Sequence, residues 1–216
     1  MGLEVMLRQI AGGMGVTLQI FVVTLVFSLP LGLLVSFGRM SKNRILSTLV
    51  KFYISVMRGT PLMLQIMVVY YCPYYLFHIQ INNSYRLWAA FAAFVINYAA
   101  YFAEIYRSGI QSMPTGQYEA AEVLGYSRVS AFFKIILPQV IKRILPAVTN
   151  EVITLVKDTS LAYTISVLEM FNVAKSLSVS QTSMMPLVAA GIFYYIFNLL
   201  VAFIMERAEK KMAYYR

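Results

Sequence analysis

Residues 118–138 read YEAAEVLGYSRVSAFFKIILP, a charged segment that separates two long apolar regions of the chain. Residues 118–124 have the composition of a short amphipathic helix, and Gly125 behind them can adopt the left-handed conformation that ends a helix. Ser127 can cap a following helix through its hydroxyl group. The segment therefore predicts a short helix, a tight turn and a second helix start. Such a helix either enters a cleft of a partner protein or lies among lipid headgroups.

The composition identifies the chain as an integral membrane protein. It has 216 residues, of which 60% are hydrophobic, and its mean hydropathy is +0.69, more than a soluble domain of this size needs to fill its core. Because a helix of about 20 apolar residues crosses the hydrocarbon core, the apolar runs predict a single all-α domain, 1–216, with five transmembrane helices. The predicted spans are 16–37, 61–79 (possibly beginning at 45), 87–106, 144–165 and 186–205.

The second span begins with an unusual sequence, residues 58–61 (RGTP). Pro61 restrains the residue before it from the helical region, and Gly59 permits sharp turning. We therefore expect the helix to be broken or bent here, with unwound backbone that could meet a ligand.

The distribution of basic residues predicts the orientation. The net charge of +9 could indicate nucleic acid binding, but the charges lie in the loops between apolar runs. With the N-terminus outside and the C-terminus inside, most of the 18 Lys and Arg residues are cytoplasmic, and only Arg8, Arg86 and Lys175 lie outside. The positive-inside rule thus favours this orientation and places residues 118–138 in the cytoplasm, between spans three and four.

Four ionisable residues fall inside the predicted spans: Glu104, Glu151, Lys157 and Asp158. Leaving them in lipid would cost on the order of 10 kcal/mol, so they must face protein or water. In span four, Glu151 and Asp158 share a polar stripe with Asn150 and Thr154, which we expect to face inward. The charges either pair internally, Glu104 for example with Arg107 or Arg58, or line a polar cavity. Three acids and one base give a negative surplus that suits an ammonium or guanidinium group.

Several kinds of catalytic site are missing from the sequence. There is no G-x-x-x-x-G-K-[ST] phosphate loop, so the chain does not bind and hydrolyse ATP by that means. The chain has one histidine and one cysteine, too few for a metal cluster or a Cys-His catalytic pair. We therefore expect no enzyme activity, no metal and no cofactor in this chain.

Motifs along almost the whole chain resemble one family. The pattern EAA-x3-G-x9-I-x-L-P of residues 119–138 resembles the cytoplasmic coupling motif of ABC importer permeases. Further runs resemble the subfamily for polar amino acids of the histidine, glutamine and arginine type. They are RGTPL at 58–62, NYAAYFAEIYR at 97–107, GQ at 116–117 and KDTSL at 157–161.

This resemblance implies a permease subunit in the plasma or inner membrane of a prokaryote. It implies a dimer of such subunits, identical or closely related, docked on two cytoplasmic ATPase subunits that bind the ATP, and served by an extracytoplasmic amino acid binding protein. It implies alternating access, with ATPase coupling assigned to Glu119, Ala120, Ala121 and Gly125. Our candidate residues for substrate binding are Thr60, Leu62, Asn97, Glu104, Lys157 and Asp158.

The substrate expected from these residues is a polar and preferably basic amino acid. The acidic surplus favours arginine, lysine or histidine, whereas glutamine is compatible with every motif quoted above. An alternative class is a secondary transporter or channel that works without ATPase partners and uses the intramembrane carboxylates as a proton relay. The EAA segment discriminates between the two, because a channel has no need of that spacing in a cytoplasmic loop.

Overall fold

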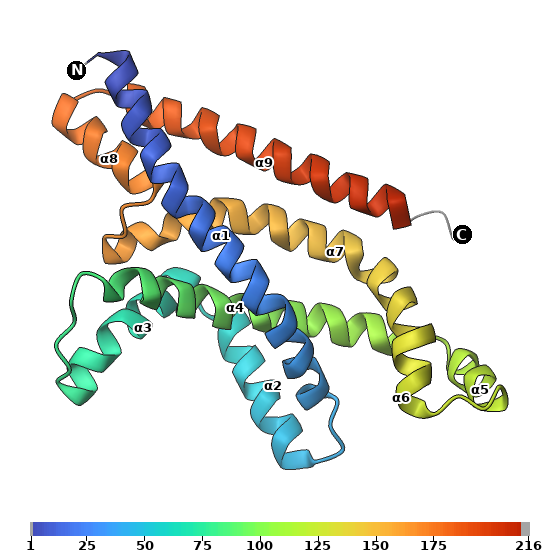
Figure 1. Ribbon diagram of the computed structural model, residues 1–216. Coiled ribbons are helices and arrows are strands. Elements are labelled where there is room, and N and C mark those ends of the chain that lie inside the picture. The colour runs from blue at the N-terminus through green and yellow to red at the C-terminus, as the bar shows by residue number, and fades with distance from the viewer. Residues whose placement is uncertain (1, 213–216) are drawn as a thin grey trace.

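The computed structural model describes residues 2–212 and forms an elongated helical bundle (Figure 1). No strand occurs among the described residues, so the all-helical class predicted from the sequence is confirmed. The helices, in chain order, are α1 (Leu3–Arg39), α2 (Arg44–Gly59), α3 (Leu62–Phe77), α4 (Tyr85–Gln111), α5 (Thr115–Val123), α6 (Arg128–Ala131), the π-helical turn η1 (Phe132–Ile136), α7 (Leu137–Asp158), the 3₁₀ segment η2 (Thr159–Ile165), α8 (Met170–Gln181) and α9 (Met185–Met212).

Within residues 2–212, α1, α4 and α9 are each long and apolar enough to cross a membrane. The pair α2 and α3 counts as a fourth crossing if the two are one broken span. Helix α7 is 22 residues long but too polar to pass the same criterion. Its polarity comes from Lys142 and Arg143 near its start together with the stripe recognised in the sequence, so length and composition give up to four spans instead of the predicted five.

The expected break before span two is confirmed. Helix α2 ends at Gly59, α3 begins at Leu62, and the two axes differ by 112°. Thr60 at the junction is extended, with φ −122° and ψ 150°, as expected for a residue that precedes proline.

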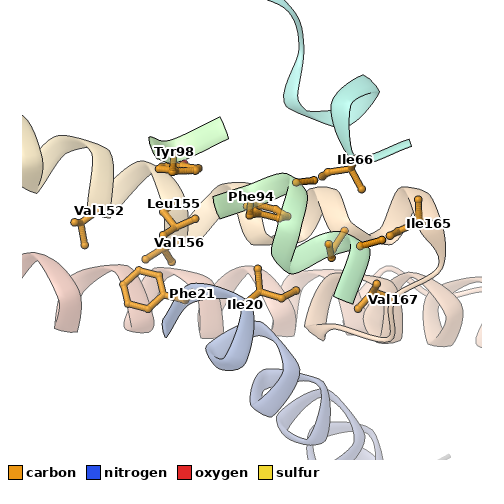
Figure 2. Packing of buried hydrophobic residues seen from close by; sticks show 14 of the residues in the cluster. Ile20, Phe21, Ile66, Phe94, Tyr98, Val152, Leu155, Val156, Ile165 and Val167 are labelled. Carbon is orange, nitrogen blue, oxygen red and sulfur yellow. The ribbon is translucent and has the colours of Figure 1, made fainter. Parts of the chain in front are cut away.

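Helix α4 is the centre of the bundle. Figure 1 shows α1 crossing the bundle diagonally, and α4 packs against α1, α2, α3 and α7. Figure 2 shows Phe94 at the centre of the buried cluster, surrounded by side chains such as Ile20, Ile66 and Leu155. The small side chains that the sequence places on α4 are buried and let its neighbours approach closely, as expected for membrane helices; they include Ala89, Ala90, Ala93, Ala99, Ala100 and Ala103.

The charged segment 118–138 folds largely as its sequence predicts. Helix α5 begins at Thr115, slightly before the predicted start, and ends at Val123. Gly125 has a φ of +79°, and the Ser127 hydroxyl accepts a hydrogen bond from the amide of Ser130, so both predicted signals are confirmed. The π-helical turn η1 was not predicted.

Helix α8 lies at the opposite end of the bundle, beside the N-terminal end of α1 (Figure 1). The carboxylate of Glu169 caps it by accepting hydrogen bonds from the amides of Phe171 (2.6 Å) and Asn172 (2.7 Å), and the Tyr194 hydroxyl donates another (3.1 Å). Glu169 is fully buried, and this burial raises its pKa to about 7. The cap therefore joins α8 to α9 in a site that water does not reach.

Gly13 allows α1 and α8 to come into contact. A Cβ at this position would lie 2.8 Å from the Cα of Met170 and 3.0 Å from its backbone nitrogen, whereas a Cβ on Gly12 would meet nothing within 4 Å. Because the atoms near Gly13 belong to the backbone of α8, no side-chain rotation can relieve the clash.

We predict that Gly13→Ala lowers the free energy of unfolding by about 1–3 kcal/mol, the usual cost of overpacking. Gly12→Ala is the matched control and should leave it unchanged or raise it slightly, since alanine is the better helix former. Thermal unfolding of the two purified variants in the same detergent measures the difference. Equal melting temperatures would contradict the close α1–α8 contact.

Candidate functional site

A cavity of about 510 Å³ opens between the end of α2, the second half of α4 and the first half of α7. Its polar lining includes Arg58, Tyr101, Glu104, Arg107, Arg143 and Glu151. Each of the three helices therefore contributes charged groups to one concave surface, which is the commonest form of a small-molecule site.

Glu104 lies in this cavity but is already paired. Its carboxylate accepts hydrogen bonds from Arg107, the shortest being 2.7 Å from Nη2, and Nε of Arg39 lies 4.0 Å away. The predicted pairing with Arg107 is confirmed, and Arg58 is not its ion-pair partner. Glu104 thus holds two arginines at the ends of α1 and α4, and its negative charge is neutralised.

Arg107 is paired with Glu104 and Arg143 is hydrogen-bonded to Ser112, so Arg58 and Glu151 are the charged groups of the cavity that make no hydrogen bond with the described residues. Arg58 is exposed in the last turn of α2, and its guanidinium carbon lies 5.4 Å from the centre of the Tyr101 ring. Glu151 is half-buried on α7. Among residues 2–212, neither side chain has an oppositely charged group within 4.0 Å. The cavity therefore offers one cation and one anion to a ligand.

The charge of the cavity differs from the expected acidic surplus. Three arginines and two glutamates line it, namely Arg58, Arg107, Arg143, Glu104 and Glu151. The sequence count included only residues inside the predicted spans, whereas these arginines come from helix ends that fold over the cavity. The cavity as a whole is therefore not negative, and its charge does not require a cationic ligand.

The break between α2 and α3 is held by two amide side chains. Nε2 of Gln65 lies 3.0 Å from the carbonyl oxygen of Met57, 3.1 Å from that of Thr60 and 2.8 Å from the Thr60 hydroxyl. Nδ2 of Asn97 also donates to the Met57 carbonyl (3.1 Å) and to Oε1 of Gln65 (2.9 Å). Asn97 is buried, with 3% of its surface exposed. Its amide thus supports the unwound backbone beside Arg58.

The end of α7 carries a second polar group, centred on Asp158. The hydroxyl of buried Tyr98 donates a hydrogen bond to Oδ2 of Asp158 (2.7 Å). Lys157 beside it is exposed and has no carboxylate within 4.0 Å among the described residues. Since Glu151 and Asp158 are seven residues apart, their side chains point the same way at a separation of about 10 Å along the helix.

The six candidate residues for substrate binding therefore do not form one pocket. Glu104 lines the cavity, Thr60 and Asn97 belong to the support of the break, Lys157 and Asp158 lie further along α7, and Leu62 starts α3 and packs against the main core. The sequence reading had not assigned Arg58, Tyr101 or Glu151 to the site, or Gln65 to its support. Glu151 carried a signal in its spacing from Asp158 on the polar stripe, and Arg58 and Tyr101 lie in the runs RGTPL and NYAAYFAEIYR, whereas Gln65 carried none.

Comparison with protein families gives one match over most of the chain. Residues 28–214 match the family described as binding-protein-dependent transport system inner membrane component. The match includes all three helices that form the cavity.

Curated relatives are similar over most of their length. A putative glutamine transport system permease protein of Rickettsia conorii is 34% identical over 94% of this chain and 92% of its own. An arginine transport system permease protein of Bacillus subtilis is 37% identical over 93% of this chain and 90% of its own length. An octopine transport system permease protein of Rhizobium radiobacter is 41% identical over 82% of this chain and 76% of its own length.

Solved structures share the fold. An amino acid ABC transporter crystallised with histidines has a chain that is 29% identical, with a TM-score of 0.85 and 94% of each chain covered. A methionine ABC transporter in an inward-facing conformation is 17% identical, with a TM-score of 0.73 over 99% of this chain and 100% of the other, and shows the likeness of the fold alone.

We predict that Gln65 and Asn97 act as one unit in supporting the break. Gln65→Ala and Asn97→Ala should each destabilise the protein, because the first leaves the Thr60 carbonyl without its donor and the second leaves Oε1 of Gln65 without its donor. The double variant should be less destabilised than the sum, with a coupling energy of about 0.5–3 kcal/mol. Thermal unfolding of the four proteins measures this coupling, and strictly additive losses would contradict the shared network.

Proposed function

The chain belongs to the family of binding-protein-dependent transport system inner membrane components and is a permease subunit of an amino acid ABC importer, and from this we propose that a polar amino acid crosses the membrane beside α2, α4 and α7. The observation that carries the proposal is the cavity in which unpaired Arg58 faces the same space as unpaired Glu151. An amino acid carries one carboxylate and one ammonium group, and this cavity has a partner for each.

The proposed arrangement in a prokaryotic plasma membrane has five spans, with α7 as the fourth and the N-terminus outside. The distribution of lysine and arginine supports this orientation. Helices α5 and α6 and the end of α9 lie at one end of the bundle (Figure 1), as expected if that end is cytoplasmic. Helix α7 then crosses the membrane with its polar stripe facing water and protein.

The exposed polar face of α7 supports the presence of a second permease subunit, identical or closely related. Asn150, Thr154 and Lys157 lie on one face of α7 and are exposed in the single chain. A lysine in mid-membrane costs about 2.5–3.5 kcal/mol if lipid surrounds it. A twofold pair would place this face at a closed, water-containing interface, so the pathway would lie between two subunits.

The proposed transport cycle depends on partners. Two cytoplasmic ATPase subunits bind and hydrolyse ATP, an extracytoplasmic binding protein delivers the amino acid, and this chain alternately exposes the site to each side. The guanidinium of Arg58 receives the α-carboxylate of the amino acid, and Glu151 receives its ammonium group. Asp158 and Lys157 provide a second charged pair about 10 Å further along α7.

The substrate class we propose is polar amino acids, with arginine, lysine, histidine and glutamine as candidates. The curated relatives include permeases named for glutamine and for arginine transport. Because the lining of the cavity has no negative surplus, its charge does not favour a basic side chain over that of glutamine. The α-carboxylate and α-ammonium groups, common to all four, are the features that the charges recognise.

Helix α5 is proposed to couple the permease to its ATPase. Glu119 and Ala120 are exposed, as is Gly125 behind them, while Ala121 is buried against the rest of the chain. Val123 is 87% exposed and Leu124 is 72% exposed, an apolar tip that a partner's cleft would cover.

We predict that Glu119→Lys uncouples ATP hydrolysis from uptake. The variant reverses the charge on the exposed face of α5, so the ATPase should bind weakly or hydrolyse ATP without transport. Glu206→Lys, an exposed site at the end of α9, is the control and should behave as wild type. The measurement is the number of ATP molecules hydrolysed per amino acid taken up, in vesicles supplied with the binding protein. A higher number in Glu119→Lys than in wild type would confirm the uncoupling. Unchanged coupling in Glu119→Lys, or uptake that needs no ATPase, would favour a secondary transporter or channel.

We predict that Arg58→Gln raises the amino acid concentration for half-maximal uptake by about tenfold to a hundredfold, the effect of losing one charge-assisted hydrogen bond. Glu151→Gln should have an effect of similar size. Lys51→Gln removes a charge from the same helix outside the cavity and should have none. A substrate analogue with the carboxylate replaced by an amide should inhibit wild type weakly, and Arg58→Gln should no longer distinguish it from the amino acid. Retained discrimination would contradict the role of Arg58.

A further inference from the structure

A second groove of about 450 Å³ lies away from the transport cavity, between the beginning of α7 and the end of α9. Its floor is apolar, and one lysine from each helix lines it. The lining that matters here is Phe133, Leu137, Ile141 and Met212, with Lys142 and Lys211.

The apolar side chains of this groove are open to the surroundings. Phe133 is 56% exposed, Met212 is 41% exposed and Ile141 is 38% exposed. Phe133 projects from the π-helical turn η1, whereas its neighbour Phe132 turns inward and meets Phe37 at 5.7 Å between ring centres. Exposed apolar side chains from two helices beside each other mark a surface that a partner or lipid covers.

The groove lies at the level of the cytoplasmic headgroups in the proposed orientation. The apolar part of α9 ends at Met205, and Lys211 follows about 9 Å further along the helix. On α7, Lys142 and Arg143 mark the same boundary. Two further cations close in sequence to the lining residues, Lys134 and Arg207, add to a positive field at this end of the bundle.

The acidic residues near the end of α9 do not neutralise Lys211. Glu206 pairs with Lys210 at 3.7 Å, and Glu209 accepts a hydrogen bond from the Thr149 hydroxyl. Both glutamates line a different cavity, with Pro146 and Phe203. Within residues 2–212, Lys211 has no carboxylate within 4.0 Å, so its charge is available to a ligand.

We propose that this groove binds one anionic phospholipid of the inner leaflet. The phosphate lies at Lys211, and an acyl chain lies along Phe133, Leu137 and Ile141. A free anion would make no contact with the apolar floor, and a lipid without net charge would gain no net attraction from Lys211, so the combination selects an anionic lipid. This site is separate from the substrate cavity and does not depend on which amino acid is transported.

Native mass spectrometry of the intact transporter, extracted from membranes that contain phosphatidylglycerol and phosphatidylethanolamine, tests the proposal. Wild type should retain phosphatidylglycerol in preference to phosphatidylethanolamine as detergent is increased. Lys211→Gln should lower that preference by about fivefold, the effect of removing one lysine from an anionic lipid. The matched control is Lys210→Gln, one residue earlier, where the lysine already pairs with Glu206.

An equal preference in Lys211→Gln and Lys210→Gln would overturn the proposal, as would a wild-type protein that shows no preference. A second variant, Ile141→Glu, places a negative charge on the apolar floor and should displace the lipid even if Lys211 contributes little. If photocrosslinking from position 141 captures the ATPase subunit and no lipid, the groove is a protein interface and the proposal fails. Substrate-stimulated uptake by these variants reports separately on the transport function.

Discussion

The backbone at the junction of α2 and α3 imposes the strictest constraint on this molecule. A helix that breaks inside a membrane exposes carbonyl groups that lipid cannot satisfy, and here the chain turns by 112°. Gln65 from the start of α3 and Asn97 from the middle of α4 supply the missing hydrogen bonds to Met57 and Thr60. The break, the buried position of Asn97 and the placement of Arg58 at the edge of the cavity therefore depend on one another.

Some polar and charged groups of the bundle are paired within the chain and stabilise it, whereas others need water or another protein surface as a partner. Glu104 joins the ends of α1 and α4 through Arg39 and Arg107, and Tyr98 supports Asp158 from the core. Asn150 and Lys157 are exposed on α7, and their side chains make no hydrogen bond or ion pair with the described residues. A membrane helix with one satisfied face and one unsatisfied polar face is stable only where water or another protein surface covers the second. The exposed polar face of α7 therefore supports the proposed pairing of this chain with a second permease subunit.

The local features of this fold could be predicted from the sequence, and the tertiary ones could not. The break before Pro61, the positive φ of Gly125 and the cap at Ser127 each depend on the conformational limits of one or two residues. The support from Gln65 depends on a partner 32 positions away, and no spacing rule identifies it. The same holds for Glu169, which looks like an ordinary surface glutamate until α1 and α9 bury it. The expected acidic surplus was not found in the cavity for a related reason. Arg58, Arg107 and Arg143 line the cavity but lie outside the predicted spans in which the charges were counted.

The contacts of α5 indicate how a force applied to it would reach the cavity. Arg143 of α7 donates hydrogen bonds to the carbonyl and the hydroxyl of Ser112, the residue directly after α4, and the hydroxyl contact is 3.0 Å. Gln139 of α7 contacts Gln117 of α5 at 3.2 Å. Arg143 lines the cavity of Arg58 and Glu151 and also a cavity of about 690 Å³ beside α5. Glu151 lies about two turns beyond Arg143 on α7, with Pro146 between them, so a displacement of α5 acts first on the helix that carries the proposed ammonium site.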